Sequence, residues 1–456
     1  MTLLAALAAG LIVVSPGQSI QDALDTSAAG DTVLLMPGVH TGSGEHLVFL
    51  NGSHNGVTLL GDTGNPGSVV LDGGGLSGPV IHIDGISADT LDRSTILSGF
   101  TVSGGSTEEL GGGLYSYYAS PTLVAVIFRE CQSGSGGGAY LWRGAPRLVS
   151  CVFDSNTCST SGAGIYAYAC DGLELLSCVF VDNSSNDDGG GVYLFHSSPL
   201  VRNCLFTGNY AWDNGGGLYL YAYSSPDIGW CTFEGNSTTY EGSAVYFRVG
   251  SEAVLHDCVI TGNITPALWM DGGGDPQFHH NCLWGNPDGD WGNLPDQTGY
   301  AGNISQDPIL VDGYHLSQTA SGQPQDSPCV NAGSVNAIEP GLNIYWTRTD
   351  QSPDTGQADM GFHYGPQPQY TGFASGSATP PVLRIHPLPA RGAVTVEHPD
   401  GPGVLSVYDL SGRLVTESPS NENGNTGLGV TGLPGGVYIV VYRGGAGTFS
   451  QRMVLL

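Results

Sequence analysis

Closely spaced carboxylates are the side chains of this 456-residue chain that could carry out catalysis most directly. Asp187 and Asp188 are adjacent in the sequence. A second acidic group lies beside two histidines and comprises Asp271, Asp275, His279 and His280. Two carboxyl groups held roughly 6.5 to 9.5 Å apart across a cleft can cleave a glycosidic bond with inversion. The spacing fixes no such separation here, and a solvated acidic turn is the favoured interpretation of Asp187 and Asp188.

Oxygen-bearing side chains also recur at one position of neighbouring repeats, five residues before an aromatic residue. They are Asp188, Asn214 and Glu241. Carboxylate and amide oxygens are the ligands that Ca²⁺ prefers, so calcium is the cofactor that this row would suit. We expect no other cofactor. A row of ordinary acidic turn residues is the alternative.

Aromatic residues form the most regular pattern that could recognise a ligand. Strand alternation directs two columns of them outward. The first column is Tyr115, Tyr140, Tyr166, Tyr193 and Tyr219, continued by Tyr246 and Trp269. The second column is Tyr117, Trp142, Tyr168, Phe195 and Tyr221. Flat rings with hydroxyl edges suit stacking on sugar faces. Alternatively, the rings stack mainly on one another and stiffen the sheet.

A repeat of Cys-x-Phe-x-x-Asn must position all of these groups. Its cysteines, at intervals of 24 to 27 residues, are Cys151, Cys178, Cys204, Cys231, Cys258 and Cys282. Its asparagines are Asn156, Asn183, Asn209, Asn236 and Asn263. The Leu-x-x-Cys-x-Phe-x-x-Asn spacing also fits a leucine-rich repeat, but the intervening Gly-Gly-Gly-Leu-Tyr-Leu-Tyr segment alternates with period two and is therefore a strand. Each repeat thus predicts three short strands and three turns, which form one coil of a parallel β-helix.

The repeat also predicts what fills the inside of the coils. The cysteine and phenylalanine columns should face inward, and the asparagines should form a ladder at a turn. Stacked strands hold neighbouring side chains about 4.8 Å apart, whereas disulfide-bonded Cβ atoms lie about 3.8 Å apart, so we expect free, buried thiols. Cys131 and Cys158 fall outside the cysteine column, and a bond between them stays open.

The chain divides into several regions. Residues 1–10 are Leu/Ala-rich and predict a partial signal peptide. Residues 11–364 predict a β-helix of about ten coils, with a capping helix near 18–25 and an irregular closing cap near 300–364. Residues 365–381 are rich in Pro, Gly and Ser and predict a linker. Residues 382–456 alternate in short hairpins and predict a small immunoglobulin-like β-sandwich. The fold class is therefore all-β.

The charge balance restricts the partners. The 41 acidic residues outnumber the 12 basic ones, which are all arginine, and the formal net charge is -29. Nucleic acid is therefore excluded, because phosphate binding needs clustered basic side chains. No apolar run reaches the roughly 18 residues that span a bilayer. We expect a monomer whose partners are neutral glycans, basic surfaces or divalent cations.

The coils resemble the right-handed β-helix repeats of pectate-lyase-like proteins. Their Gly-Gly-x-x and Phe-x-x-Asn pairs are similar to the repeats of polymorphic outer-membrane proteins. The stretches SPCVNAG at 327–333 and TRTDQSPDTGQADMGFHY at 347–364 resemble the end of many exported bacterial β-helix proteins. These resemblances imply the fold and export of the chain.

The last 75 or so residues resemble the type IX secretion sorting domain. The matching motifs are Pro387-Leu-Pro389, Tyr408-Asp-Leu-Ser-Gly-Arg413, Leu433-Pro-Gly-Gly-Val-Tyr438 and Phe449-Ser-Gln-Arg452. The chain departs from the usual pattern at His386, Leu388 and Arg452. The resemblance implies contact with the secretion machinery, and a protein that is secreted or attached to the outer surface of a bacterium.

Three functions compete. A non-catalytic adhesin or glycan-binding rod would use the aromatic columns. A polysaccharide lyase or hydrolase acting on acidic polysaccharide is the second, but the arginines of the rod form no column beside paired acids, and Asp187-Asp188 alone matches the motifs of the related galacturonan hydrolases. A purely structural surface component is the third. The missing catalytic motifs favour the first.

Overall fold

The architecture comes from a computed structural model that describes residues 10–85, 91–311 and 314–365. In the C-terminal part it describes 384–386, 393–397, 403–409, 414–420, 425–429, 433, 436–444 and 447–455. The predicted signal peptide, apart from Gly10, and the predicted linker from residue 366 on lie outside the described residues. The chain forms two compact units, residues 1–365 and residues 366–456.

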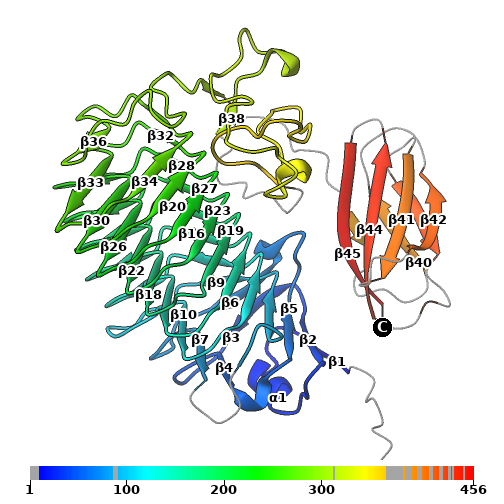
Figure 1. The fold of residues 1–456 in the computed structure, drawn as a ribbon. Coiled ribbons are helices and arrows are strands. Elements are labelled where there is room, and N and C mark those ends of the chain that lie inside the picture. Colours follow the sequence, from blue (N-terminus) through cyan, green and yellow to red (C-terminus); the bar gives the residue numbers. More distant parts are fainter. Residues whose placement is uncertain are drawn as a thin grey trace, which may run out of the picture. The chain divides into compact units, whose positions relative to one another are not determined.

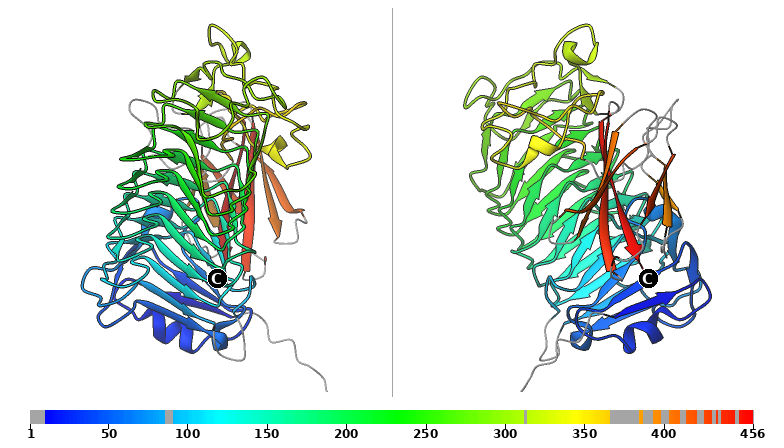
Figure 2. Two further views of the ribbon diagram at one scale, coloured as in Figure 1. Left: turned by 60° about the vertical axis from the view of Figure 1, so that its left-hand side comes forward. Right: turned by 90° about the vertical axis from the view of Figure 1, so that its right-hand side faces the viewer.

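The first unit is a solenoid of parallel strands (Figures 1 and 2). Sheet 1, which carries the aromatic columns, has ten strands. They are β4 (Val48–Asn51), β7 (Ile81–Asp84), β10 (Leu114–Tyr117), β14 (Ala139–Trp142), β18 (Ile165–Tyr168), β22 (Val192–Phe195), β26 (Leu218–Tyr221), β30 (Val245–Arg248), β33 (Leu268–Asp271) and β36 (Trp291–Gly292).

Sheet 2 follows sheet 1 within each coil and has eleven strands. They are β1 (Leu11–Val14), β2 (Thr32–Leu35), β5 (Thr58–Leu60), β8 (Ile96–Ser98), β11 (Thr122–Val124), β15 (Arg147–Val149), β19 (Glu174–Leu176), β23 (Leu200–Arg202), β27 (Asp227–Gly229), β31 (Val254–His256) and β34 (Gln277–His279).

Sheet 3 completes the coil with ten strands. They are β3 (Gly38–Thr41), β6 (Val69–Asp72), β9 (Thr101–Ser103), β12 (Ile127–Arg129), β16 (Val152–Asp154), β20 (Val179–Val181), β24 (Leu205–Thr207), β28 (Thr232–Glu234), β32 (Val259–Thr261) and β35 (Cys282–Trp284). A small fourth sheet contains β13 (Gln132–Ser133), β17 (Thr157–Cys158), β21 (Ser184–Ser185), β25 (Tyr210–Ala211) and β29 (Ser237–Thr238). The predicted β-helix of about ten coils is confirmed.

The inside of the coils is built from stacked identical residues. Fully buried phenylalanines stack with centroids 4.6 to 5.0 Å apart, from Phe128 through Phe153, Phe180 and Phe206 to Phe233. In the asparagine ladder, the Asn183 Nδ2 donates to the Asn209 Oδ1 and to the carbonyl oxygen of Phe153, both at 2.9 Å. The ladder runs one coil further than predicted, because Asn286 accepts from the Asn263 backbone N–H at 2.9 Å.

The cysteine column differs from the prediction at its last member. Asn281, not Cys282, takes the position after Cys258, because the last coil is shorter and Cys282 pairs in register with Val259. Cys282 is therefore on the outer side of sheet 3, in a cluster with Leu316, Cys329 and Met360. All ten cysteines are buried and free.

The bond left open between Cys131 and Cys158 is not formed. Their positions in the coil explain this. The Cys131 backbone N–H donates to Asn156, which places Cys131 in the asparagine column, whereas Cys158 pairs in register with Ser133. Burial raises the pKa of both thiols to about 12, so both act as small apolar side chains.

A short helix, α1 (Ile20–Asp25), covers the first coil where the amphipathic pattern predicts one. The Ser19 hydroxyl accepts from the Asp22 N–H, and Ile20, Ala23 and Leu24 are buried. Three-residue 3₁₀ helices are η1 (Gly52–His54), η2 (Pro66–Ser68), η3 (Thr319–Ser321) and η4 (Leu342–Ile344). Among the described residues, no helix is long and apolar enough to cross a bilayer.

The expected closing cap near 300–364 has two parts. Asn303 follows the last coil and accepts from the Asn281 N–H at 3.0 Å. Residues 314–364, here called the return segment, instead run back along the side of the rod. The His363 N–H donates to the Asn203 Oδ1 at 2.6 Å, and the Asn203 Nδ2 donates back to the His363 carbonyl oxygen at 2.9 Å. Strand β38 (His315–Leu316), at the start of the return segment, pairs antiparallel with β37 (Leu310–Val311), which precedes the segment.

The second unit has two antiparallel sheets. One contains β39 (Arg384–His386), β40 (Ala393–Glu397) and β43 (Asn425–Gly429), and the other β41 (Gly403–Asp409), β42 (Leu414–Pro419), β44 (Gly436–Gly444) and β45 (Gly447–Leu455). Both sheets contribute buried residues, among them Val396, Leu428, Leu405, Val407 and Val440. These strands form the small β domain that the alternating pattern predicts.

Candidate functional site

Sheet 1 holds both aromatic columns in register. Tyr115 pairs with Tyr140, and Tyr117 with Trp142, because strands β10 and β14 align without a shift. The same register continues through β18, β22 and β26. Two residues along each strand therefore separate the columns, and one strand spacing separates the rings within a column.

The first column is packed tightly on itself. Ring centroids lie 4.8 to 5.1 Å apart from Tyr140 to Tyr246, with nearly parallel planes. Tyr219 is 0% exposed, and Tyr140, Tyr193 and Tyr246 are also buried. Burial, the largest cause, raises the pKa of Tyr246 to about 12. These rings are part of the packing of the sheet.

The second column stays half-buried along its length. Trp142 stacks on Tyr168 with centroids 4.2 Å apart, and Tyr168 stacks on Phe195 at 5.0 Å. The stack breaks at both ends. Tyr117 is tilted by 43° from Trp142, and Tyr221 meets Phe195 at 65°. A partly open strip of three stacked rings therefore lies between two rings of different orientation.

Several residues beside the columns were not predicted. His82 and Phe49 extend the first column by two coils, and the His82 ring contacts the Tyr115 ring edge-on at 5.1 Å. Arg248 lies 5.5 Å from the Tyr221 ring centre and donates from Nη1 to the Tyr219 hydroxyl at 2.8 Å. A single arginine does not recur with the repeat, so the sequence pattern did not predict its contact with the tyrosines, which is seen only in the strand register.

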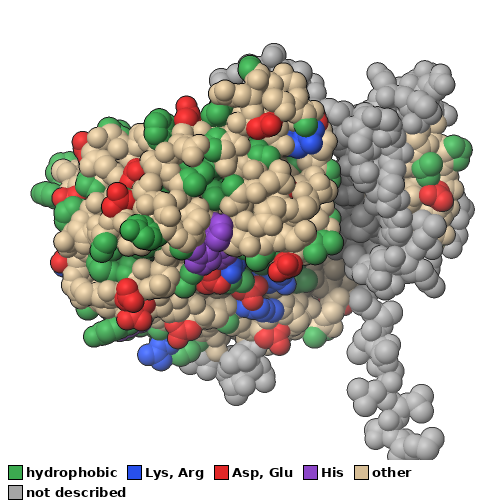
Figure 3. Space-filling view, turned by 45° about the horizontal axis from the view of Figure 1, so that its top comes forward, with side chains coloured by type: hydrophobic (Ala, Val, Ile, Leu, Met, Phe, Trp, Pro, Cys, Tyr) green, Lys and Arg blue, Asp and Glu red, His purple; other side chains and the backbone are tan. Residues whose placement is uncertain are grey.

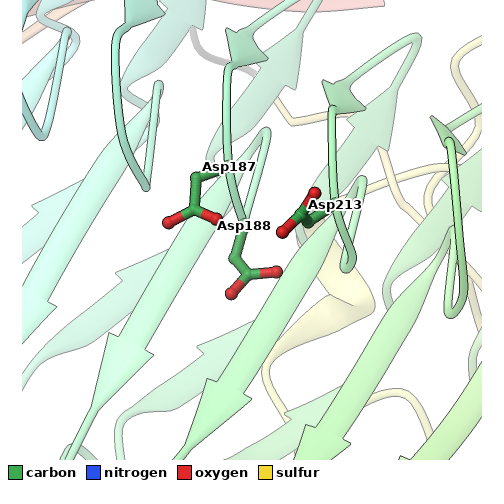
Figure 4. Close-up of side chains that lie close together, drawn as sticks. All are labelled: Asp187, Asp188 and Asp213. Carbon is green, nitrogen blue, oxygen red and sulfur yellow. The ribbon is translucent and has the colours of Figure 1, made fainter.

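Three carboxylates converge at the turns before sheet 1. Oxygen atoms of Asp187, Asp188 and Asp213 lie within 4.8 Å of one another, and Figure 4 shows these side chains meeting from neighbouring turns. Asp188 is 8% exposed and accepts from the Asn214 backbone N–H and Nδ2, each at 3.1 Å. Burial, with Asp187 nearby, raises the pKa of Asp188 to about 6. Burial and Asp187 also raise the pKa of Asp213.

The residues of the predicted calcium row, Asp188, Asn214 and Glu241, lie on successive turns and are linked through the Asn214 amide. Asn214 donates from Nδ2 to Asp188 and accepts the Glu241 backbone N–H at 3.2 Å, so its amide links three successive turns. The carboxylates that approach each other are instead Asp187, Asp188 and Asp213. Asp213 follows Asp187 by one coil, a relation that the irregular turn sequence conceals.

Two exposed aromatic residues lie at the same turns. Trp212 is 55% exposed and precedes Asp213 in the sequence, and Tyr240 is 57% exposed. The Tyr240 N–H donates to the Asp213 carbonyl oxygen at 3.2 Å, which places the two turns on adjacent coils. Neither residue belongs to a repeating column, so the sequence pattern did not single them out.

The acidic and histidine residues near 271–280 are not brought together as one group. Asp271 ends β33 on sheet 1, where it accepts from the Tyr246 hydroxyl at 3.5 Å. His279 lies on sheet 2, with its ring stacked 5.1 Å from that of His256. The two residues belong to different sheets, because the turn after β33 separates them.

Comparison with known protein families supports both units. Residues 80–228 and 116–283, two overlapping stretches, match the family described as right handed beta helix region. Residues 384–456 match the secretion system C-terminal sorting domain. A search of curated proteins gives no match. The family matches confirm the resemblances to β-helix proteins and to the sorting domain.

Proposed function

We propose that this chain, which joins a right-handed β-helix region to a C-terminal secretion sorting domain, is a non-catalytic glycan-binding protein. The sorting domain indicates that the protein is secreted or attached to the outer surface of a bacterium, and it implies contact with the secretion machinery. In that location a rigid rod can present one long face to polysaccharide or to the glycans of another cell.

The observation that carries the proposal is the half-buried second column on sheet 1. Its rings keep part of their surface open over five successive coils, whereas four rings of the first column are buried, namely Tyr140, Tyr193, Tyr219 and Tyr246. A strip of open rings at constant spacing suits an extended chain of sugar units, because each ring can contact the apolar face of a sugar. Hydroxyl groups of Tyr168 and Tyr221 can bind sugar hydroxyls.

The charges near the strip favour a neutral glycan. Asp84 precedes Tyr117 in register, and Asp271 follows Arg248 at the other end. Arg248 is engaged with Tyr219 and Tyr221. With a net charge of -29 on the chain, a polyanionic glycan would be repelled.

A glycan array probed with the full-length protein tests the proposal. Tyr168→Ala removes the middle ring of the strip, and Trp142→Ala removes its first. Each change should weaken binding of a neutral glycan about tenfold. Tyr223→Ala is the matched control, because Tyr223 is 68% exposed but lies outside the column. Absence of binding, or equal binding by all variants, would favour the purely structural alternative.

A hydrolase is the second candidate, and the carboxylate group favours it. Asp188, with its pKa raised to about 6, is suited to hold a proton near neutral pH, and the oxygens of Asp187 and Asp213 lie within 4.8 Å. Glycosidases likewise use a pair of carboxyl groups, one as the acid and the other as the base or nucleophile. Release of reducing sugar ends by the wild type, abolished in Asp188→Asn, would establish this activity in place of simple binding.

A further inference from the structure

A cavity of about 540 Å³ lies on the side of the rod, between sheet 2 and the return segment. One wall is formed by β19, β23 and the corner residues that follow them. The other wall is formed by Val335 and by residues 339–342, 344 and 345 of the return segment. Figure 3 shows histidine, acidic and basic side chains side by side on one face of the rod.

Arg202 is the charged residue on the rod wall. It donates from Nη2 to Asp227 and contacts the His256 Nε2 through Nη1. A Cβ atom at Gly229 would lie 2.0 Å from the Arg202 Nη1, so the glycine leaves the space through which the guanidinium reaches His256. Residues of three successive coils, namely Arg202, then Asp227 and Gly229, then His256, therefore hold the guanidinium in place.

Trp230 lies directly behind this guanidinium. The Arg202 guanidinium carbon lies 5.2 Å from the indole centre, and the His256 ring meets the indole edge-on at 4.7 Å. Trp230 is 5% exposed and lines the cavity, yet its Nε1–H has no hydrogen-bond partner among the described residues.

The polar groups of the rod wall are mainly donors. The Ser177 Oγ accepts from the Asn203 Nδ2 at 3.0 Å, which leaves its O–H to donate. Both Nη atoms of Arg202 are engaged, and none of the hydrogen bonds found in the described part of the chain uses its Nε–H. The Asn203 amide is occupied by His363 and Ser177. An occupant of this wall must therefore supply acceptors.

The rest of the cavity is apolar. Leu176 and Leu200 flank the polar groups on the rod, and Pro340, Leu342 and Ile344 face them from the return segment. Glu339 is exposed at the rim. Such a lining excludes a strongly hydrated ligand and fits a compact apolar body.

We propose that this cavity is a second binding site, which takes a small carboxylate with an apolar body. The carboxylate accepts from the Ser177 O–H and the Arg202 Nε–H, and the apolar body packs between Leu200 and Leu342. Charge-assisted hydrogen bonds make an anionic acceptor the strongest partner for these donors. The site is separate from sheet 1 and does not depend on glycan binding.

Nuclear magnetic resonance on the full chain labelled with ¹⁵N-tryptophan tests the site. Trp230→Phe assigns the indole N–H signal of Trp230 among the seven tryptophans. Sodium benzoate should shift this signal saturably, whereas benzyl alcohol and benzylamine, which lack the carboxylate, should shift it at least about tenfold less effectively. No shift with benzoate, or an equal shift with benzyl alcohol, overturns the proposal.

Gly229→Ala provides the second variant. Its Cβ, which would lie 2.0 Å from the Arg202 Nη1 and 2.4 Å from the His256 Cε1, displaces the end of the Arg202 side chain and the His256 ring, while the backbone stays outside the left-handed region. Benzoate affinity should fall about tenfold or more, with an unchanged circular dichroism spectrum. Unchanged affinity would remove Arg202 from the site. Trp142→Ala should leave the benzoate response intact, so failure of the glycan proposal and failure of this one are distinguishable.

Discussion

The two aromatic columns of sheet 1 stand two residues apart on the same strands, and yet they differ in exposure. The first column is largely closed, with Tyr219 fully buried, while Tyr168 and its neighbours in the second stay half-buried. Both columns stack at about the strand spacing. A repeat therefore fixes the alignment of side chains but not their availability to a ligand, which depends on what packs beside them.

The neighbours of the first column explain its closure. Arg248 and Asp188 both bind Tyr219, so polar side chains from adjacent coils cover the ring edge. In the second column Arg248 reaches only the last ring, Tyr221. The first column is therefore expected to contribute mainly to stability and the second mainly to binding.

Truncation of one ring in each column should give the largest contrast. Tyr219→Ala removes a fully buried ring and should lower the free energy of unfolding by about 3 to 5 kcal/mol. Tyr168→Ala should lower it by less than about 2 kcal/mol, because this ring is half-exposed. Urea unfolding followed by circular dichroism measures both. Equal losses would remove the distinction between the columns.

The effect of Asp188 on stability at different pH values tests whether this carboxyl group is buried over the first column. Its folded pKa of about 6 lies above the ordinary value of 3.8, so the folded state binds more protons between these values. Stability from this group is thus highest below about pH 4 and is lost as the pH rises through 6. The free energy of unfolding of Asp188→Asn should exceed that of the wild type by about 1 to 3 kcal/mol at pH 7.5 and should equal it near pH 4. An identical difference at both values would contradict a raised pKa.

Ring coupling within the second column should give the smallest effect. A double-mutant cycle of Trp142→Ala and Tyr168→Ala, whose centroids lie 4.2 Å apart, should show a coupling of about 0.5 to 1.5 kcal/mol in the free energy of unfolding. The edge-on pair of Phe195 and Tyr221 serves as the comparison. No coupling between Trp142 and Tyr168 would show that these rings do not act as a continuous strip.

The sequence predicts what repeats. The alternation and the Cys-x-Phe-x-x-Asn period place Phe180, Asn183 and Tyr193 correctly, because stacked coils give the same environment to equivalent residues. The prediction placed Cys282 at the end of the cysteine column, where the structure has Asn281. It was wrong because the last coil is shorter and shifts the register by one residue.

The sequence does not predict contacts that occur once. The return segment reaches Asn203 across 160 residues, and no periodic pattern encodes this pairing. The cavity beside Arg202 and Trp230 exists because of it. Similarly, Asp213 joins Asp187 and Asp188 through the register of turns whose sequences differ. Such features depend on tertiary packing of residues outside the repeat.

Binding of a neutral glycan by the full-length protein, measured by calorimetry alongside Tyr168→Ala and Tyr219→Phe, tests the central claim most directly. Tyr219→Phe removes one hydroxyl from the closed column and keeps its ring. If the second column binds the glycan, Tyr168→Ala should lower the affinity about tenfold and Tyr219→Phe should leave the affinity unchanged. Binding that survives loss of Tyr168 at full strength would contradict a function for this column.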